Sequence, residues 1–188
     1  MSRFEQYTTT NAPDGSRPLL QAVEQSLGFV PNLYATFAES PALFEGVLAL
    51  EKSLENGSLT KVERQLVKIA VSTENECTYC VAAHSTLAGM LKARPEVVAA
   101  IRSGTPVPDA KLEALVRFAR AAVRARGFVP ASDVADFFAA GYTKAELLEV
   151  VGHVGLKTLH NYVHALTNAP LDAAFQPQAW DRKQLKVA

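Results

Sequence analysis

TKVERQLVKIAVSTENECTYCVAAHSTLAGMLK, residues 60–92, is the stretch of sequence that decides the fold. Thr60 followed by Glu63 is a capping box, which marks the start of a helix. Apolar residues then recur at spacings of three and four, which predicts a helix that ends near Asn75. The same spacing returns after Cys77 and predicts a separate helix over residues 77–92. The apolar stripe of the first helix is formed by Val62, Leu66, Ile69 and Ala70.

The rest of the chain shows the same helical periodicity, and alternating β-branched runs are missing. The sequence therefore predicts an all-α helical bundle in one domain over residues 1–188. An N-terminal extension (1–40) precedes the core (41–170), and a C-terminal tail (171–188) without clear periodicity follows it. Further helices are expected at 18–27, 33–39, 41–56, 95–102, 111–126, 130–140 and 143–167.

An internal helical repeat is one interpretation of two similar segments. Residues 60–63 (TKVE) match residues 143–146 (TKAE), and Tyr79 matches Tyr162 at the same offset. Capping boxes also recur by chance, so the repeat and a coincidence both stay open. In this register Cys77 corresponds to His160, so only the first unit carries cysteines.

Composition narrows the functional classes. The 188 residues include 19 basic and 19 acidic side chains, so no net field favours a nucleic-acid or membrane partner. No run approaches the roughly 18 apolar residues that a membrane-spanning helix needs, and no signal peptide is recognisable. We therefore expect a cytoplasmic protein, in which two closely spaced cysteines are typical of catalysis or metal binding.

Cys77, Cys80 and His84 form the candidate catalytic site. Spacings of three, four and seven place them on one face of a helix. Backbone N–H groups at a helix start favour a thiolate, and an adjacent histidine can accept the thiol proton. Cys80, nearer to His84 in sequence, is assigned as the thiolate that attacks a peroxide, and Cys77 as its resolving partner. Turnover then needs an external dithiol reductant and no bound cofactor.

Residues 75–84, NECTYCVAAH, preceded by Ala70-Val71-Ser72, resemble the AhpD-like alkylhydroperoxidase family within the carboxymuconolactone decarboxylase-like superfamily. The resemblance implies an all-helical fold and peroxidase or disulfide reductase activity at the two cysteines and the histidine. It also implies a hydroperoxide or disulfide substrate, a thiol reductant or reductase as partner, and a homo-oligomer (dimer, trimer or hexamer).

Gln65 departs from this family pattern, because the family's proton relay usually has a glutamate twelve residues before the first cysteine. Glutamine cannot ionise, although it can orient His84 or a water by hydrogen bonding. Tyr79 stands where some members have a histidine, and both residues are candidates for a proton relay. A replacement base has to come from elsewhere, with Glu63 on the wrong face of its helix and Glu74 undecided.

Other interpretations stay open. The cysteine pair could instead serve a redox sensor or a disulfide reductase without efficient peroxidase turnover, or the chain could be a decarboxylase or lactone-processing enzyme of the same superfamily. Zinc ligation by the motif is disfavoured, because no second ligand pair follows at typical spacing. We expect the histidines of the last helix to make local hydrogen bonds or line an interface, the Asn161-Tyr162 pair to pack against the first unit, and Trp180 to anchor the tail or contact a neighbouring subunit. These histidines are His153, His160 and His164.

Overall fold

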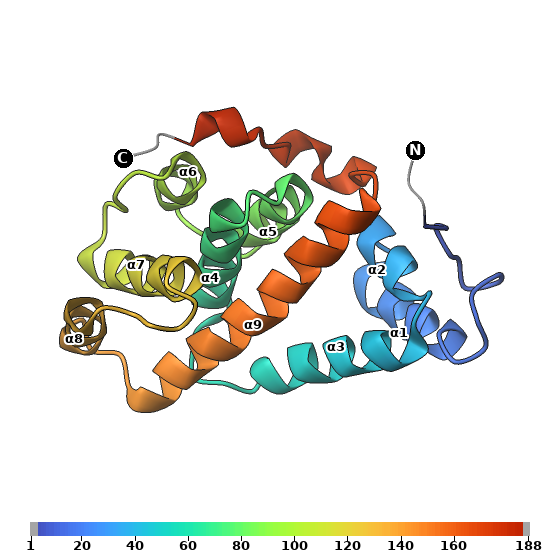
Figure 1. Cartoon of the computed structure of the whole chain (residues 1–188). Helices are drawn as coiled ribbons and strands as arrows, with labels where there is room; N and C mark the ends of the chain where they lie inside the picture. The colour runs from blue at the N-terminus through green and yellow to red at the C-terminus, as the bar shows by residue number, and fades with distance from the viewer. Residues whose placement is uncertain (1–3, 186–188) are drawn as a thin grey trace.

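A computed structural model describes residues 4–185 as a bundle of α-helices with a C-terminal segment of two short 3-10 helices (Figure 1). Within this part of the chain no strand is found, as the periodicity predicted. The helices are α1 (Arg17–Leu27), α2 (Asn32–Phe37), α3 (Pro41–Leu54), α4 (Lys61–Glu74), α5 (Thr78–Met90), α6 (Pro95–Ser103), α7 (Ala110–Arg124), α8 (Ala131–Ala139), α9 (Lys144–Thr167), η1 (Ala173–Gln178) and η2 (Arg182–Gln184).

The long helix α9 organises the bundle. It runs diagonally across the molecule (Figure 1) and contacts α3, α4, α5 and α7. Helix α4 is the central element, since it packs against α5, α6, α7 and α9. The segment after α9 returns over α5 and reaches α6.

Two apolar clusters meet along α4, α5 and α9. The first is built mainly from α4, α6, α7 and α8, and the second from α1, α2, α3 and the first turns of α5. Both cysteines belong to the second cluster, together with buried side chains such as Phe37 and Phe44. The site therefore lies inside the bundle, between its N-terminal helices and its central layer.

The break between α4 and α5 positions the cysteines. Helix α4 ends with the Cys77 N–H donating to the Ser72 carbonyl at 2.9 Å, and Glu76 adopts the left-handed conformation with φ +52°. This geometry is a Schellman-type helix end, in which glycine usually occupies the left-handed position. A non-glycine residue there costs roughly 1–2 kcal/mol. The sharp turn makes Cys77 the N-cap of α5.

Helix boundaries agree with the sequence-based predictions within two residues. Both capping boxes form, with Thr60 and Thr143 each paired with the glutamate three residues later. The proposed repeat holds only for these helix starts, because α9 continues without interruption where α4 and α5 are separated. Trp180 packs within its own chain: it is buried, and its indole N–H donates to the Arg102 carbonyl of α6 at 3.0 Å.

Candidate active site

The two sulfurs lie at the start of α5 and are close enough to interact. Cys77 is the N-cap residue, and the backbone N–H of Cys80 donates to its Sγ at 3.4 Å. Both thiols are reduced and buried, with 4% of Cys77 and 1% of Cys80 exposed. Exposed N–H groups of the first helical turn favour negative charge at this position. The N-cap geometry therefore brings the pair together as the spacing predicted.

The two thiols have different pKa values because their surroundings differ. Burial alone raises the pKa of Cys80, but the hydrogen bond from the Cys77 thiol, the charge of Lys157 and a hydrogen bond from Asn161 outweigh it and lower this pKa to about 7. The same sulfur–sulfur hydrogen bond, together with burial, raises the pKa of Cys77. Cys80 is thus the thiol that ionises first, and Cys77 keeps its proton and donates it.

His84 is held between two partners, neither of which is a sulfur. Its Nδ1–H donates to Gln65 Oε1 at 2.8 Å, because an amide oxygen can only accept. This leaves Nε2 as an acceptor, and Lys157 Nζ donates to it at 2.7 Å. Burial first, and then the charge of Lys157, hold the pKa of His84 well below its ordinary value. Both ring nitrogens of His84 are thus engaged, by Gln65 and by Lys157, and transfer of the Cys80 proton to His84 stays a prediction.

Helix α9 supplies the opposite wall of the site. Asn161 is buried, accepts from the Asn75 amide at 3.0 Å and donates to Ser72 Oγ at 3.2 Å, so it packs against α4 as expected. The expectation for Tyr162 is wrong, because this side chain is 60% exposed on the outer face of α9. Lys157 and Asn161 lie one turn apart, which places both on the face toward Cys80.

The residue that the sequence interpretation missed is Lys157. It is 3% exposed, in line with His153, His160 and Asn161 on the buried face of α9. A lysine is almost never fully buried without a role in pairing or chemistry. The sequence signal that could have identified Lys157 is its position on the same helical face as these three buried residues.

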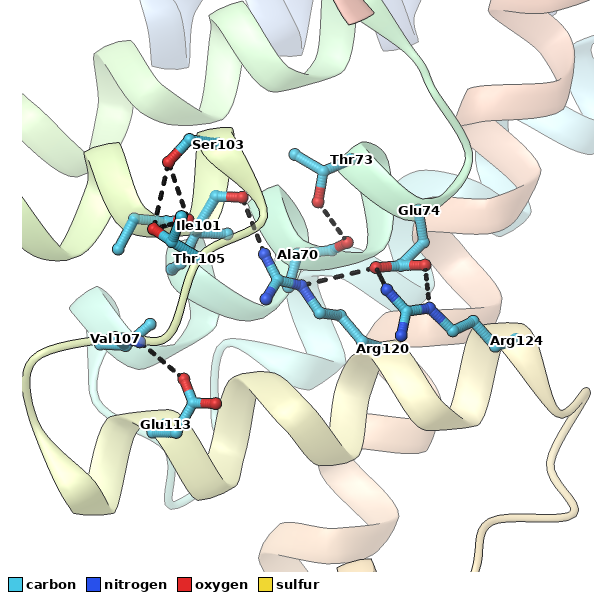
Figure 2. Close-up of polar contacts among 11 residues, drawn as sticks. Ala70, Thr73, Glu74, Ile101, Ser103, Thr105, Val107, Glu113, Arg120 and Arg124 are labelled. Atoms are coloured by element: carbon cyan, nitrogen blue, oxygen red, sulfur yellow. Dashed lines mark hydrogen bonds and ion pairs between the residues drawn. The ribbon is translucent and has the colours of Figure 1, made fainter. Parts of the chain in front are cut away.

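The carboxylates near the motif in sequence are engaged elsewhere. Figure 2 shows Glu74 between Arg120 and Arg124 of α7, with Nε–Oε distances of 3.5 and 2.6 Å. Arg120 also donates to the Ile101 carbonyl at 2.8 Å. Glu63 completes its capping box and accepts from the Tyr142 hydroxyl at 2.8 Å. Both glutamates therefore stabilise the bundle rather than serve the thiols.

Tyr79 points away from the proposed relay. Its hydroxyl donates to Asp172 at 2.5 Å and accepts from the Leu33 N–H at 3.3 Å, which ties α5 to α2 and to the C-terminal segment. Burial and the Asp172 carboxylate raise the pKa of Tyr79. Its ring packs against His164 and Phe175. These contacts give Tyr79 a structural position and leave Gln65 as the relay candidate that touches His84.

A second group of polar side chains is buried beside the thiols. Glu51 of α3 accepts from the Tyr34 hydroxyl and lies 3.8 Å from Lys68 of α4. Close by on α9, burial above all lowers the pKa of His160 to about 3 and that of His153 to about 4. His160 Nδ1–H donates to the Leu156 carbonyl and His164 Nε2–H to the Ala169 carbonyl. Among residues 4–185 no group of three side chains is arranged to hold a metal ion.

Comparison with known proteins agrees with this architecture. The model of the carboxymuconolactone decarboxylase family matches residues 41–124, which contain the cysteines, His84 and Gln65. An alkylhydroperoxidase AhpD core, an uncharacterised peroxidase-related protein from Ralstonia eutropha JMP134, is 26% identical over 93% of this chain and 94% of its own, with a TM-score of 0.82. Residues 41–124 thus match the carboxymuconolactone decarboxylase family, and the chain as a whole is similar to AhpD-like proteins. Its all-α AhpD-like fold is thereby confirmed.

Other solved structures share this fold at lower identity. A peroxidase-related protein from Silicibacter sp. TM1040 is 22% identical over 93% of this chain and 97% of its own, with a TM-score of 0.77. A cysteine-to-alanine variant of the debrominase Bmp8, in complex with 2,3,4-tribromopyrrole, is 18% identical over 95% and 97%, with a TM-score of 0.79. A search of curated proteins finds no significant match. Because relatives of this fold carry out different reactions, activity has to be argued from the site.

Proposed function

We propose that this AhpD-like protein is a thiol-dependent oxidoreductase that cycles Cys77 and Cys80 between dithiol and disulfide while it reduces a hydroperoxide. One observation carries the proposal: Cys80, whose pKa is about 7, lies beside a thiol that keeps its proton. A pKa near neutrality combines a large thiolate fraction with good nucleophilicity. The expected role of Gln65 is to orient His84.

The chemistry follows from the two acidities. The Cys80 thiolate attacks the outer peroxide oxygen, the O–O bond breaks, and an alcohol leaves once a proton reaches its oxygen. Cys80 is then a sulfenic acid. The sulfur of Cys77 attacks the Cys80 sulfur, water leaves, and the Cys77–Cys80 disulfide forms. An external dithiol restores both thiols and is itself oxidised to a disulfide.

Burial of the sulfurs favours a small oxidant. Because only 1% of Cys80 is exposed, a small peroxide suits this thiolate better than a disulfide on a folded partner. A cavity of about 690 Å³ is lined by Thr78 and Tyr79, the two residues that stand between the cysteines in the sequence. Leu171 and Trp180 of the C-terminal segment also line it. Its mixed lining suits an organic hydroperoxide.

The test is hydroperoxide consumption with dithiothreitol as reductant. Wild type should turn over, whereas Cys80→Ser and Cys77→Ser should each lose most of the rate. Ser85→Ala is the matched control, because Ser85 is buried on the same helix and bonded to Arg102 rather than to the site. Equal rates for wild type and both cysteine variants would contradict the proposal.

The alternatives predict different outcomes. Lactone turnover that persists in the Cys77→Ser/Cys80→Ser double variant would favour a decarboxylase or lactone-processing enzyme. Rapid disulfide formation with slow peroxide turnover would favour a redox sensor.

We also propose a homo-oligomer. Helix α9 exposes a row of large apolar side chains on its outer face, a typical feature of an interface. Sedimentation of the purified chain tests this proposal, and a monomer at micromolar concentration would contradict it. The row is Leu148, Val151, Tyr162 and Leu166.

The described part of the chain contains no helix with the length and apolar character needed to cross a membrane.

A further inference from the structure

A buried lysine, Lys157, lies beside His84, where the sequence led us to expect an acid–base group. Lys157 is 3% exposed, and its Nζ donates to His84 Nε2 at 2.7 Å. The buried carboxylate in this region, Glu51, accepts from the Tyr34 hydroxyl and pairs with Lys68 at 3.8 Å. The direct polar partner of the Lys157 ammonium is thus a neutral imidazole, which does not balance its charge. A buried cation needs an anion nearby.

The charge of Lys157 also lowers the pKa of Glu51, but this carboxylate is shared with Lys68, and the second anion that fits is the Cys80 thiolate. The charge of Lys157 acts on both sulfurs and favours their ionised forms. One turn further along α9, Asn161 donates a hydrogen bond to the Cys80 sulfur. Helix α9 therefore presents a cation and an amide donor to Cys80.

Gln65 and His84 fix the position of the ammonium. The Gln65 carbonyl oxygen accepts from His84 Nδ1–H at 2.8 Å, and this bond leaves the lone pair of Nε2 for Lys157. A glutamate at position 65 would favour an imidazolium, whose two N–H groups would both donate and could not accept from the ammonium. The glutamine that departs from the family pattern is the residue that suits a lysine at position 157.

We infer that Lys157 is the counter-ion and proton carrier of Cys80, and that Gln65 and His84 act as positioning residues for its ammonium. The inference rests on the proposed function. When the thiolate attacks the peroxide, the leaving alkoxide takes a proton from the ammonium, which yields a sulfenic acid, an alcohol and a neutral amine. During reduction the external dithiol releases two protons: one returns to Cys77, and the other restores the ammonium beside the Cys80 thiolate.

The groups around Lys157 come from each element packed on it. Glu51 and Lys68 carry charges of opposite sign, Cys80 is partly ionised near pH 7, and the remaining titratable groups are neutral there. These groups are Tyr34 (α2), Glu51 (α3), Lys68 (α4), Cys77, Cys80 and His84 (α5), and His153 and His160 (α9).

The first test measures the alkylation rate of Cys80 by iodoacetamide between pH 5 and 9, in a Cys77→Ser background. Lys157→Met should move the midpoint to higher pH and slow alkylation at pH 7 about tenfold or more, because the thiolate fraction falls by that factor when the pKa rises toward 8.5. Lys157→Arg, which keeps the charge, should recover most of the rate. Lys68→Met, the loss of a largely buried lysine from α4, is the matched control and should shift the midpoint much less. A Lys157→Met profile that coincides with that of its parent would overturn the inference.

The second test varies the leaving group and does not depend on the thiolate fraction, because rates are compared within one protein. An alkoxide from tert-butyl hydroperoxide needs a proton, whereas the acetate from peracetic acid does not. Lys157→Gln, a polar variant that preserves the fold more readily, should lose about tenfold more of the rate with the alkyl hydroperoxide than with the peracid. Equal losses with both oxidants would contradict proton delivery by Lys157.

The outcomes separate the inference from the function on which it rests. If peroxide forms no Cys77–Cys80 disulfide in wild type, the proposed function fails, and the alkylation profile still decides whether Lys157 controls Cys80. If the disulfide forms and the Lys157 variants behave like wild type in both tests, the function stands and the role of Lys157 fails.

Discussion

Acidification from pH 7.5 to 5 should destabilise the protein through two buried histidines of α9. Burial is the largest cause that lowers the pKa of His153 to about 4 and that of His160 to about 3, and nearby lysine and arginine charges add to it. In the unfolded chain a histidine titrates near 6.5. Below pH 6.5 the two histidines therefore bind protons in the unfolded state but not in the folded state, so the free energy of unfolding decreases as the pH falls through this value.

The magnitude follows from the width of this window. Between pH 6.5 and 5 each histidine stays neutral in the folded state, and each pH unit costs about 1.4 kcal/mol, so each contributes a loss of about 2 kcal/mol. Together they remove about 4 kcal/mol, a large share of a typical net stability of about 5–15 kcal/mol. Carboxylates with ordinary or lowered pKa values lose their contribution mainly below this window.

Urea unfolding at pH 7.5, 6.5, 5.5 and 5.0 measures the effect. Wild type should lose at least about 4 kcal/mol across the series, because His84, whose pKa is also held well below its ordinary value, adds to the two histidines of α9. His160→Gln should lose about 2 kcal/mol less than wild type, since glutamine does not titrate and can still donate to the Leu156 carbonyl. Each variant is referred to its own value at pH 7.5, so a general destabilisation cancels. A stability that is flat between pH 7.5 and 5, or an unchanged pH slope in both His153→Gln and His160→Gln, would refute the reasoning.

Three further predictions concern single positions. Gln65→Glu should raise the pKa of His84, because a carboxylate replaces the amide oxygen 2.8 Å from Nδ1; a histidine NMR titration measures it, and an unmoved resonance would contradict the hydrogen bond. Trp180→Ala should cost about 3 kcal/mol in urea unfolding, since it removes a buried indole and its bond to the Arg102 carbonyl, whereas Trp180→Phe should cost less; no loss in either would show that the tail is not anchored. Glu76→Gly should stabilise the fold by roughly 0.5–1 kcal/mol, because glycine adopts φ +52° without strain; a destabilised variant would contradict the assigned strain.

Local signals in the sequence predicted most of the fold. Capping boxes at Thr60 and Thr143 act within one turn, so both helix starts could be read from four residues each. The spacing of Cys77 and Cys80 likewise predicted their proximity, because three residues span one helical turn. Such features depend on neighbours in the chain, and the structure places them as expected.

The contacts of the site that the sequence did not reveal join residues far apart in the chain. Lys157 meets His84 across 73 positions, and Asn161 meets Ser72 across 89. Such contacts depend on how α9 packs against α4 and α5, which periodicity on one helix does not determine. The same reason explains why the direction of the Tyr79 hydroxyl, toward Asp172 and away from the thiols, could not be predicted.

Mass spectrometry of the thiols before and after one equivalent of hydroperoxide tests the central claim most directly. The purified protein should start with both cysteines free and end with a mass two hydrogens lower, with Cys77 and Cys80 joined in one disulfide-linked peptide that dithiothreitol cleaves. Two thiols that remain free, or a stable sulfinic acid on Cys80 with Cys77 unmodified, would contradict a dithiol–disulfide cycle at this site.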